Sequence, residues 1–280
     1  ILEASLHCPR CGSIYPVREG VAFLLPESPG DSSSPGRYET AALLSSYLWS
    51  HYADLTNDPD AGKAYSQWGR LVEAAPGLGL DAGCAVGRFT FELAGMVDFA
   101  VGFDRSFSFV REARMLAGRR RVAFALQEEG RLESRREVRL PESWDGRQVE
   151  FIVADAQAIP FRAESFSVVA SLNVVDKIAR PLLHLRELNR AAAKRDAQLL
   201  FSDPFSWSEE ISREQDWLGG TSRGPFSGKA ADNVSALLAG KKAGFTPHWR
   251  IDRTGHLWWK IRNHANHFEM IRSFFLKADR

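Results

Sequence analysis

A glycine-containing loop decides the fold of this 280-residue chain, and it reads Leu80-Asp81-Ala82-Gly83-Cys84-Ala85-Val86-Gly87-Arg88. The loop joins an apolar, strand-like run to a helical stretch. Glycines are needed where a chain turns sharply and its backbone approaches a ligand. The dinucleotide pattern Gly-x-Gly-x-x-Gly is missing, and an acid two residues before the first glycine is a poor neighbour for a pyrophosphate. The loop therefore favours a ligand with an ammonium group.

Strand-like and helical stretches alternate outward from this loop. Such alternation predicts an α/β fold with a doubly wound, mostly parallel sheet and helices on both faces. The expected strands are 79–81, 99–104, 151–155, 166–172 and 198–202, and the last strands come from 245–277. The expected helices are 38–52, 89–96, 107–117, 180–193 and 230–243.

Three acids stand at the ends of three successive predicted strands. Asp81 ends the first, Asp104 the second and Asp155 the third. Asp104 follows the loop at about the distance where an acid meets ribose hydroxyls in nucleotide-binding α/β folds. Carboxyl ends of parallel strands meet at one crevice, so the three acids are expected to converge on one ligand. The alternative is that these acids only cap strand ends.

Over residues 71–202 the chain resembles the class I S-adenosylmethionine-dependent methyltransferases, whose loop reads Asp-x-Gly-x-Gly-x-Gly; Ala85 here replaces the middle glycine. The resemblance implies a seven-stranded Rossmann-like sheet and S-adenosylmethionine as cofactor. It also implies roles for eight residues. Asp81 would lie near the methionine amino group, Gly83 and Gly87 would shape the loop, Asp104 would bind the ribose, Arg105 would flank the adenine face, Asp155 and Ala156 would bind the adenine edge, and Asn173 would flank the methionine moiety.

Composition excludes several classes of protein. Apolar residues make up 44% and charged residues 25%, the balance of an ordinary globular protein. Lys plus Arg is 36 and Asp plus Glu is 35, so a net charge of +1 gives no global electrostatic case for nucleic acid. We expect no membrane span and no signal peptide. Three cysteines favour a reducing, cytoplasmic setting, and nothing in the sequence fixes an oligomeric state.

The first 36 residues are expected to form a separate segment and linker, followed by the main domain at 37–280. Cys8 and Cys11 form a Cys-x-x-Cys pair, and two short strands are expected around a turn at Glu19-Gly20. The segment is similar to the second half of zinc-ribbon domains attached to methyltransferases. A structural zinc site needs four ligands. Zinc is therefore expected only if residues upstream of this sequence supply the others, and the alternative is two free thiols.

A narrower resemblance concerns the methyl acceptor. The helical stretch 38–52, the loop 81–88 and the segment 207–220 are similar to the methyltransferase domain of the ovothiol-synthesis enzyme. That resemblance implies a small acceptor, methylated on an imidazole nitrogen or a thiol of a histidine-like compound. The stretch 38–52 would act as a lid, and 207–220 would close the other side. The residues expected to act on the acceptor are Tyr47, His51, Tyr52, Asp176 and Arg213, for each of which packing or capping is the plainer alternative.

Other functions remain open at this level. An arginine-rich excursion at 118–150 suggests a hairpin, and a zinc-ribbon methyltransferase acting on ribosomal or transfer RNA is the second hypothesis. From 111 to 139, however, nine arginines alternate with five glutamates, and no ladder of aromatic residues accompanies them. A module that binds the cofactor without turnover, and a nicotinamide oxidoreductase, are further alternatives. The three strand-end acids argue against the module, and the missing Gly-x-Gly-x-x-Gly argues against the oxidoreductase.

Overall fold

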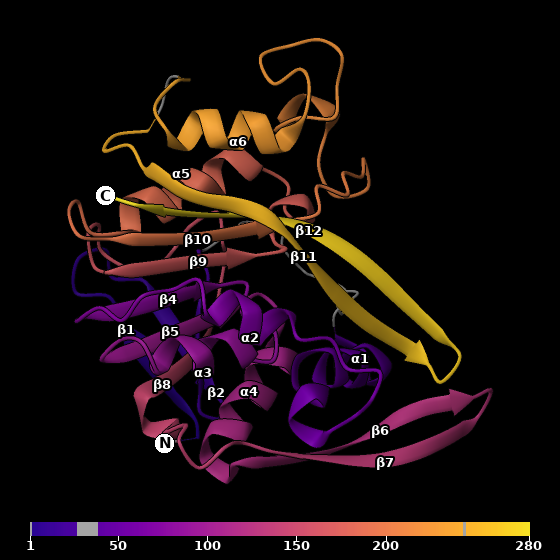
Figure 1. Cartoon of the computed structure of the whole chain (residues 1–280). Coiled ribbons are helices and arrows are strands. Elements are labelled where there is room, and N and C mark those ends of the chain that lie inside the picture. The colour runs from indigo at the N-terminus through magenta and orange to yellow at the C-terminus, as the bar shows by residue number, and fades with distance from the viewer. Residues whose placement is uncertain (1, 27–38, 243–244) are drawn as a thin grey trace.

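The computed structural model describes residues 2–26, 39–242 and 245–280. Within these ranges one ten-stranded sheet runs through the molecule (Figure 1), in the order β1-β2-β3-β8-β5-β4-β9-β10-β12-β11. The linker expected before residue 37 lies almost wholly outside the described residues. No helix among those described is long and apolar enough to cross a membrane.

Seven of these strands form the sheet that the sequence predicted for the main domain. Five are parallel: β8 (Val149–Ala154), β5 (Phe99–Asp104), β4 (Leu78–Ala82), β9 (Val168–Leu172) and β10 (Gln198–Asp203). Two antiparallel strands, β12 (His267–Asp279) and β11 (Arg250–His264), complete the sheet. The strand order reverses at β4, between β5 and β9, and the crevice outside the carboxyl ends there is where α/β sheets bind ligands.

Helices cover both faces of the sheet, as a doubly wound fold requires. One face packs against α1 (Ala41–Tyr52), α2 (Ala64–Gly69), α3 (Arg88–Ala94) and α4 (Phe107–Arg119). The other face packs against α5 (Pro181–Ala191) and α6 (Ala230–Leu238). Alternate residues of a strand supply the two cores: Leu200 of β10 lies in the first, and Phe201 lies in the second.

Most of the predicted elements are confirmed, with shifts of a few residues at their ends. Helix α1 begins at Ala41 because Thr40 caps it, its hydroxyl accepting from the Leu43 amide at 3.3 Å. Helix α6 ends at Leu238, five residues before the predicted end. Helix α2 and strand β1 (Ala4–His7) were not predicted, because both are too short to show a clear period.

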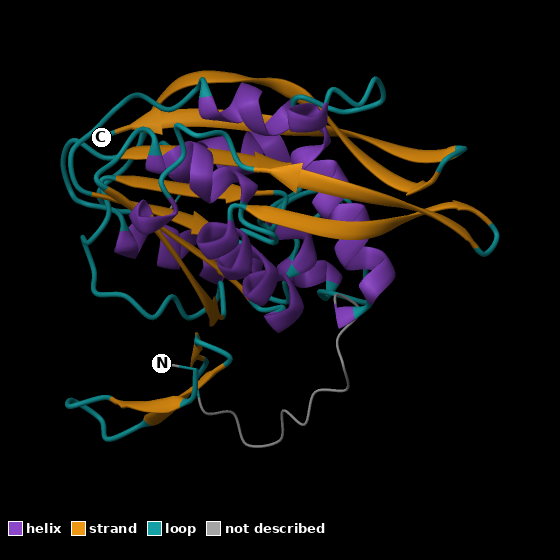
Figure 2. Cartoon of the chain, turned by 90° about the horizontal axis from the view of Figure 1, so that it is seen from below, coloured by secondary structure: helices purple, strands orange, loops and turns teal. Residues whose placement is uncertain are grey.

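Two long hairpins project past the carboxyl edge of the sheet (Figures 1 and 2). One is β11–β12, and the other is the separate pair β6 (Arg121–Glu129) and β7 (Leu132–Arg139), which confirms the hairpin predicted from the arginine-rich excursion. Arg262 of β11 joins them by an ion pair with Glu128 of β6 at 2.7 Å. Helix α1 lies between the hairpins and contacts both β11 and β6.

The first segment adds its strands to the edge of this sheet. Strands β2 (Ile14–Arg18) and β3 (Val21–Leu24) flank the predicted turn, and β3 pairs in parallel with β8. Val21 is fully buried in the α1–α4 core, and the ring centroids of Phe23 and Phe107 lie 5.1 Å apart. The segment therefore covers the edge of β8, which would otherwise expose unpaired backbone groups.

We expect Val21→Ala to lower the free energy of unfolding of the whole chain by about 1.5–3 kcal/mol, because it removes buried methyl groups and leaves a cavity. Urea unfolding followed by circular dichroism measures this loss. Ile14→Ala is the control: Ile14 lies on the same segment but is 56% exposed, so its effect should stay within about 0.5 kcal/mol. Equal effects of the two variants would show that β3 is not integrated into the core.

Candidate active site

The loop after β4 packs closely against the Val174 side chain and the Phe151 ring. Gly83 and Gly87 have φ of +79° and +84°, the left-handed region that favours glycine. A Cβ on Gly83 would lie 2.3 Å from the Val174 side chain, and one on Gly87 would lie 2.6 Å from the Phe151 ring. Ala85 itself has φ of +45°, so the alanine stands in a conformation that a glycine would adopt more easily. Both glycines are therefore required by packing as well as by backbone conformation.

Asp104, at the end of β5, holds this loop. Its carboxylate accepts hydrogen bonds from the amides of Ala85 at 3.0 Å and Ser106 at 2.9 Å. Burial raises the pKa of the Asp104 carboxyl, and the amide hydrogen bonds oppose that shift. The carboxylate thus links the loop after β4 to the loop after β5. Its remaining lone pairs are available to hydroxyl groups of a ligand.

Asp81, in β4, is almost fully buried, and one of its oxygens accepts a hydrogen bond from the Thr90 hydroxyl at 2.7 Å. Burial raises the pKa of Asp81 to about 7. A carboxyl group with such a pKa changes between its protonated and ionised forms near neutral pH. A cation placed beside it would favour the ionised form.

The turn after β8, where the adenine is expected, has a support that the sequence did not reveal. Asp155, just after β8, accepts from the Gln157 amide at 2.8 Å and lies 3.8 Å from Arg105. The carbonyl of Ala156 is hydrogen-bonded to Nδ1 of His184 at 2.9 Å. Burial lowers the pKa of His184 to about 4, so this ring is neutral. His184 belongs to α5, 28 residues along the chain, and no local pattern marks it.

Asn173 follows β9 at the same edge. It has φ of +59°, and its backbone N–H donates to the Ser202 carbonyl at 2.7 Å. Its side-chain oxygen Oδ1 is buried without a hydrogen-bond partner among the described residues. A buried acceptor in a strained residue is a candidate for binding a donor group of a ligand.

Helix α1, the predicted lid, is attached by direct hydrogen bonds to the loop after β4, which is the expected cofactor loop. The Tyr52 hydroxyl donates to the Val86 carbonyl at 2.7 Å. The Arg88 guanidinium donates to the His51 carbonyl at 2.9 Å and pairs with Asp54 at 2.6 Å. Arg88 is only 1% exposed. Its position in the loop was evident from the sequence, but its role in binding the lid was not.

The side chains of Tyr47 and His51 lie on the same part of α1. Their ring centroids are 5.7 Å apart, and the Tyr47 ring also lies 5.9 Å from that of Trp259. Nε2 of His51 is 2.6 Å from the Tyr65 hydroxyl. Burial and the charge of Arg88 lower the pKa of His51 well below its ordinary value. His51 is thus a neutral, buried ring, and a catalytic role for it stays a prediction.

Two buried acids follow β9 and β10. The Asp203 carboxylate accepts from the amides of Val175 at 2.8 Å and Phe205 at 2.7 Å, so it braces both turns. Asp176 accepts from the Ser206 amide and Lys177, while its Oδ1 is buried without a partner within the described ranges. Burial raises the pKa of both carboxyl groups. Asp176 therefore has acceptor capacity left for a ligand.

The predicted second lid, 207–220, is ordered by its aromatic residues. Trp207 and Trp217 stack with ring centroids 6.0 Å apart and an interplanar angle of 12°. Arg213 is exposed and stands just before a short turn, Glu214–Asp216. Its expected contact with an acceptor carboxylate stays a prediction.

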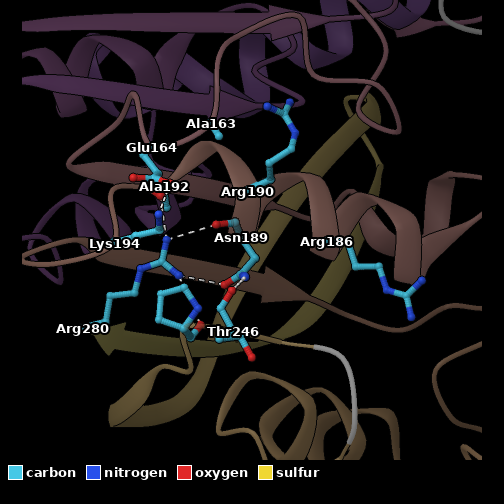
Figure 3. Close-up of a pocket in the computed structure, with 10 residues that line it drawn as sticks. Ala163, Glu164, Arg186, Asn189, Arg190, Ala192, Lys194, Thr246 and Arg280 are labelled. Atoms are coloured by element: carbon cyan, nitrogen blue, oxygen red, sulfur yellow. Dashed lines mark hydrogen bonds and ion pairs between the residues drawn. The ribbon is translucent and has the colours of Figure 1, made fainter.

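A hollow of about 230 Å³ near Arg280 lies at the opposite edge of the sheet (Figure 3). The Arg280 guanidinium donates to the carbonyls of Ala192 and Ala193 and to the side chain of Asn189. The guanidinium also donates to the Asn189 carbonyl of α5 at 3.0 Å, one of the carbonyls that the end of a helix leaves without an intrahelical partner. The Arg280 guanidinium therefore binds the end of α5 and the residues after it rather than standing free for a ligand.

The cysteines occupy two kinds of environment. Cys8 and Cys11 stand in the turn between β1 and β2, and both are free thiols. No group of three or more His, Cys, Asp and Glu side chains among the described residues could hold a metal ion. The zinc hypothesis thus still depends on ligands from outside this sequence. Cys84 is buried in the cofactor loop, and burial raises its pKa, so it is a packed thiol.

Comparison with known proteins gives one family match and several solved structures. Residues 80–200 match the family model described as a methyltransferase domain. No curated protein matches the sequence. Solved structures of similar fold include a putative methyltransferase from Bacillus halodurans, with 16% identity, 78% of this chain and 98% of that chain covered, and a TM-score of 0.49. An S-adenosylmethionine-dependent methyltransferase from Methanosarcina mazei has 18% identity, coverages of 72% and 92%, and a TM-score of 0.47.

We expect Asp104→Ala to weaken S-adenosylmethionine binding tenfold or more, because it removes two proposed hydrogen bonds between a carboxylate and the ribose. Isothermal titration calorimetry measures the dissociation constant. Asp104→Asn is the matched variant: it keeps one oxygen, which can accept from one of the two amides (Ala85 or Ser106), and it removes the charge, so it should weaken binding less than alanine does. Unchanged affinity in the alanine variant would contradict the assignment of Asp104 to the ribose.

We expect S-adenosylmethionine affinity to rise by roughly tenfold from pH 5.5 to 7.5. The Asp81 carboxyl, with its pKa raised to about 7, is largely protonated at the lower pH, and the proposed contact with the methionine ammonium needs the carboxylate. Binding should also release a proton, which titrations in buffers of different ionisation enthalpy detect. Asp81→Asn should abolish both effects; a wild-type affinity that does not change over this range would place the ammonium elsewhere.

Proposed function

The chain is an S-adenosylmethionine-dependent methyltransferase, and we propose that it transfers the methyl group to a small molecule, on an imidazole nitrogen or a thiol of a histidine-like compound. The observation that supports this proposal best is the attachment of α1 to the cofactor loop. The Tyr52 hydroxyl and the Arg88 guanidinium bind helix and loop together at 2.7 Å and 2.9 Å. A lid bonded to the loop leaves room for a compact acceptor and excludes water.

The residues proposed to bind the cofactor are those that the resemblance to class I S-adenosylmethionine-dependent methyltransferases implies. We propose that Asp81 binds the methionine ammonium, that Asp104 binds the ribose hydroxyls and that Asn173 accepts a hydrogen bond through its unpartnered Oδ1. Gly83 and Gly87 would shape the loop. Arg105, Asp155 and Ala156 would surround the adenine.

The acceptor would lie between α1 and the ends of β9 and β10. Methyl transfer from a sulfonium is an in-line displacement, so the protein must hold the acceptor atom, the methyl carbon and the sulfur in line. Tyr47, His51 and Tyr52 would form the lid side. The unpartnered Oδ1 of Asp176 could accept a hydrogen bond from an imidazole N–H, which would orient the other ring nitrogen towards the methyl group. Arg213 is the proposed contact at the outer lid.

The β6–β7 hairpin supports a small acceptor over RNA. Ala123 stands opposite Glu137, and Gln127 stands opposite Glu133. Arg139 pairs with Glu137 at 2.7 Å. The Arg120 side chain is not free for phosphates, because it donates to the carbonyls of Pro141 and Trp144. Acidic residues thus interrupt the basic face that an RNA backbone would need.

We expect Tyr47→Phe and Asp176→Asn each to lower methyl transfer to small thiol-imidazoles at least tenfold while changing S-adenosylmethionine affinity less than twofold. The reason is that both residues are proposed to contact the acceptor and not the cofactor. Incorporation of labelled methyl groups measures turnover, with transfer RNA and ribosomal RNA assayed alongside.

The control for this prediction is the triple variant Arg121→Glu, Arg135→Glu, Arg139→Glu, which reverses charge on one exposed face of the hairpin and leaves Arg120 intact. It should retain turnover within about twofold on a small acceptor. If the triple variant loses activity on RNA while the two pocket variants do not, the RNA hypothesis replaces the small-molecule one.

A further inference from the structure

Three polar atoms near the lid are buried and find no hydrogen-bond partner in the described parts of the chain: Nδ1 of His51, Nε1 of Trp259 and Oγ of Ser273. The three residues are 3%, 7% and 0% exposed. Leaving a buried donor unpaired costs a folded protein stability, so each such atom requires an explanation. A ligand or an ordered water that hydrogen-bonds to them would provide one.

The three atoms belong to one region. Tyr47 links two of the residues, since its ring lies 5.7 Å from that of His51 and 5.9 Å from that of Trp259. Ser273 pairs with Leu257, and Trp259 pairs with Ile271. Ser273 and Trp259 are therefore diagonal neighbours on the same face of the hairpin, a separation that long side chains bridge.

This region lies at the acceptor side of the proposed site. Asp203, the last residue of β10, pairs with Phe274, so Ser273 stands immediately past the carboxyl edge of the sheet. Trp259 packs in the same core as α1. The hairpin face and the lid helix thus meet where the acceptor is expected.

Two of the three groups act as donors. An indole Nε1 can only donate. His51 is neutral and its Nε2 is 2.6 Å from the Tyr65 hydroxyl. Burial raises the pKa of Tyr65 well above its ordinary value, so the phenol keeps its proton and can donate a hydrogen bond to Nε2. In the tautomer in which Nε2 accepts this bond, the His51 ring proton resides on Nδ1, which is then a donor, and the Ser273 hydroxyl can donate as well.

We infer that Trp259, His51 and Ser273 form a subsite that binds a carboxylate group of the acceptor. A carboxylate offers about four lone-pair directions and no proton, which matches a set of donors. This inference rests on the proposed small-molecule function and adds that the acceptor is an acid, recognised by neutral donors beneath the lid.

The test uses one acid and its amide as probes: L-histidine and L-histidinamide, added to the full chain with S-adenosylhomocysteine. The indole resonance of Trp259, assigned by its loss in Trp259→Phe, is followed by ¹⁵N-edited NMR. We expect L-histidine to shift this resonance downfield and to bind about tenfold more tightly than the amide. Sodium acetate, which carries the carboxylate alone, should shift it in the same direction at higher concentration.

Two variants and one control complete the experiment. Ser273→Ala and Trp259→Phe should each weaken L-histidine binding about three- to tenfold and leave histidinamide and S-adenosylhomocysteine binding unchanged. Trp258→Phe is the control, since Trp258 is the adjacent residue on β11 and is 53% exposed; it should change nothing. Ser273→Ala keeps the inference testable if Trp259→Phe destabilises the core.

The outcomes separate this inference from the proposed function. If acids shift the Trp259 resonance and no imidazole is methylated, the carboxylate subsite stands and the imidazole acceptor is wrong. If imidazoles are methylated while acid and amide bind equally and the variants have no selective effect, the subsite is overturned and ordered water fills the space. If neither acid nor acetate perturbs Trp259, the inference is likewise overturned.

Discussion

The pairing of one buried arginine connects the parts of this structure that make the site. Arg88 begins α3 directly after the cofactor loop and is 1% exposed. A buried guanidinium must be fully paired, because an uncompensated charge in the interior costs several kcal/mol. Its partners are Asp54, Glu92 and the His51 carbonyl, and its cation also lies 5.0 Å from the centroid of the Trp144 ring. These partners fix the end of the lid helix and the segment before β8 relative to the loop.

The same constraint orders the cofactor side. Because Arg88 and Tyr52 attach α1 to the loop, the loop cannot move independently of the lid. Asp104 bonds the loop from the other side through the Ala85 amide. Binding groups held in place in this way lose little entropy when a ligand arrives. The hydrogen bond from the Ala85 amide to Asp104 thus helps to hold an alanine with φ of +45° in the left-handed region.

The fold and the cofactor side could be predicted largely from local pattern. Strand–helix alternation, a glycine loop and acids at strand ends each occupy a few consecutive residues, and topology then brings them to one edge. The partners of Arg88 and Ala156 could not be predicted in this way. Asp54 is 34 residues from Arg88, and His184 is 28 residues from Ala156. Nothing in a local period specifies which distant side chain completes such a pair, and the same applies to the pairing of β3 with β8.

The residues expected to bind the acceptor come from distant segments of the chain, whereas those expected to bind the cofactor follow local patterns. The residues expected to bind the cofactor are a glycine-containing loop and three acids at strand ends, which stand at regular spacings in the sequence. The proposed acceptor region is assembled from α1, the turns after β9 and β10, and the β11–β12 hairpin. Within it, Ser50 of α1 and Lys260 of β11 are hydrogen-bonded although they lie 210 residues apart in the chain. The hairpin register decides that Trp259 faces the lid while Trp258 faces solvent, and a shift of one residue would exchange them. The proposed acceptor site therefore depends on strand register and on the attachment of α1 to the loop after β4, two properties that arise only when the whole sheet is assembled.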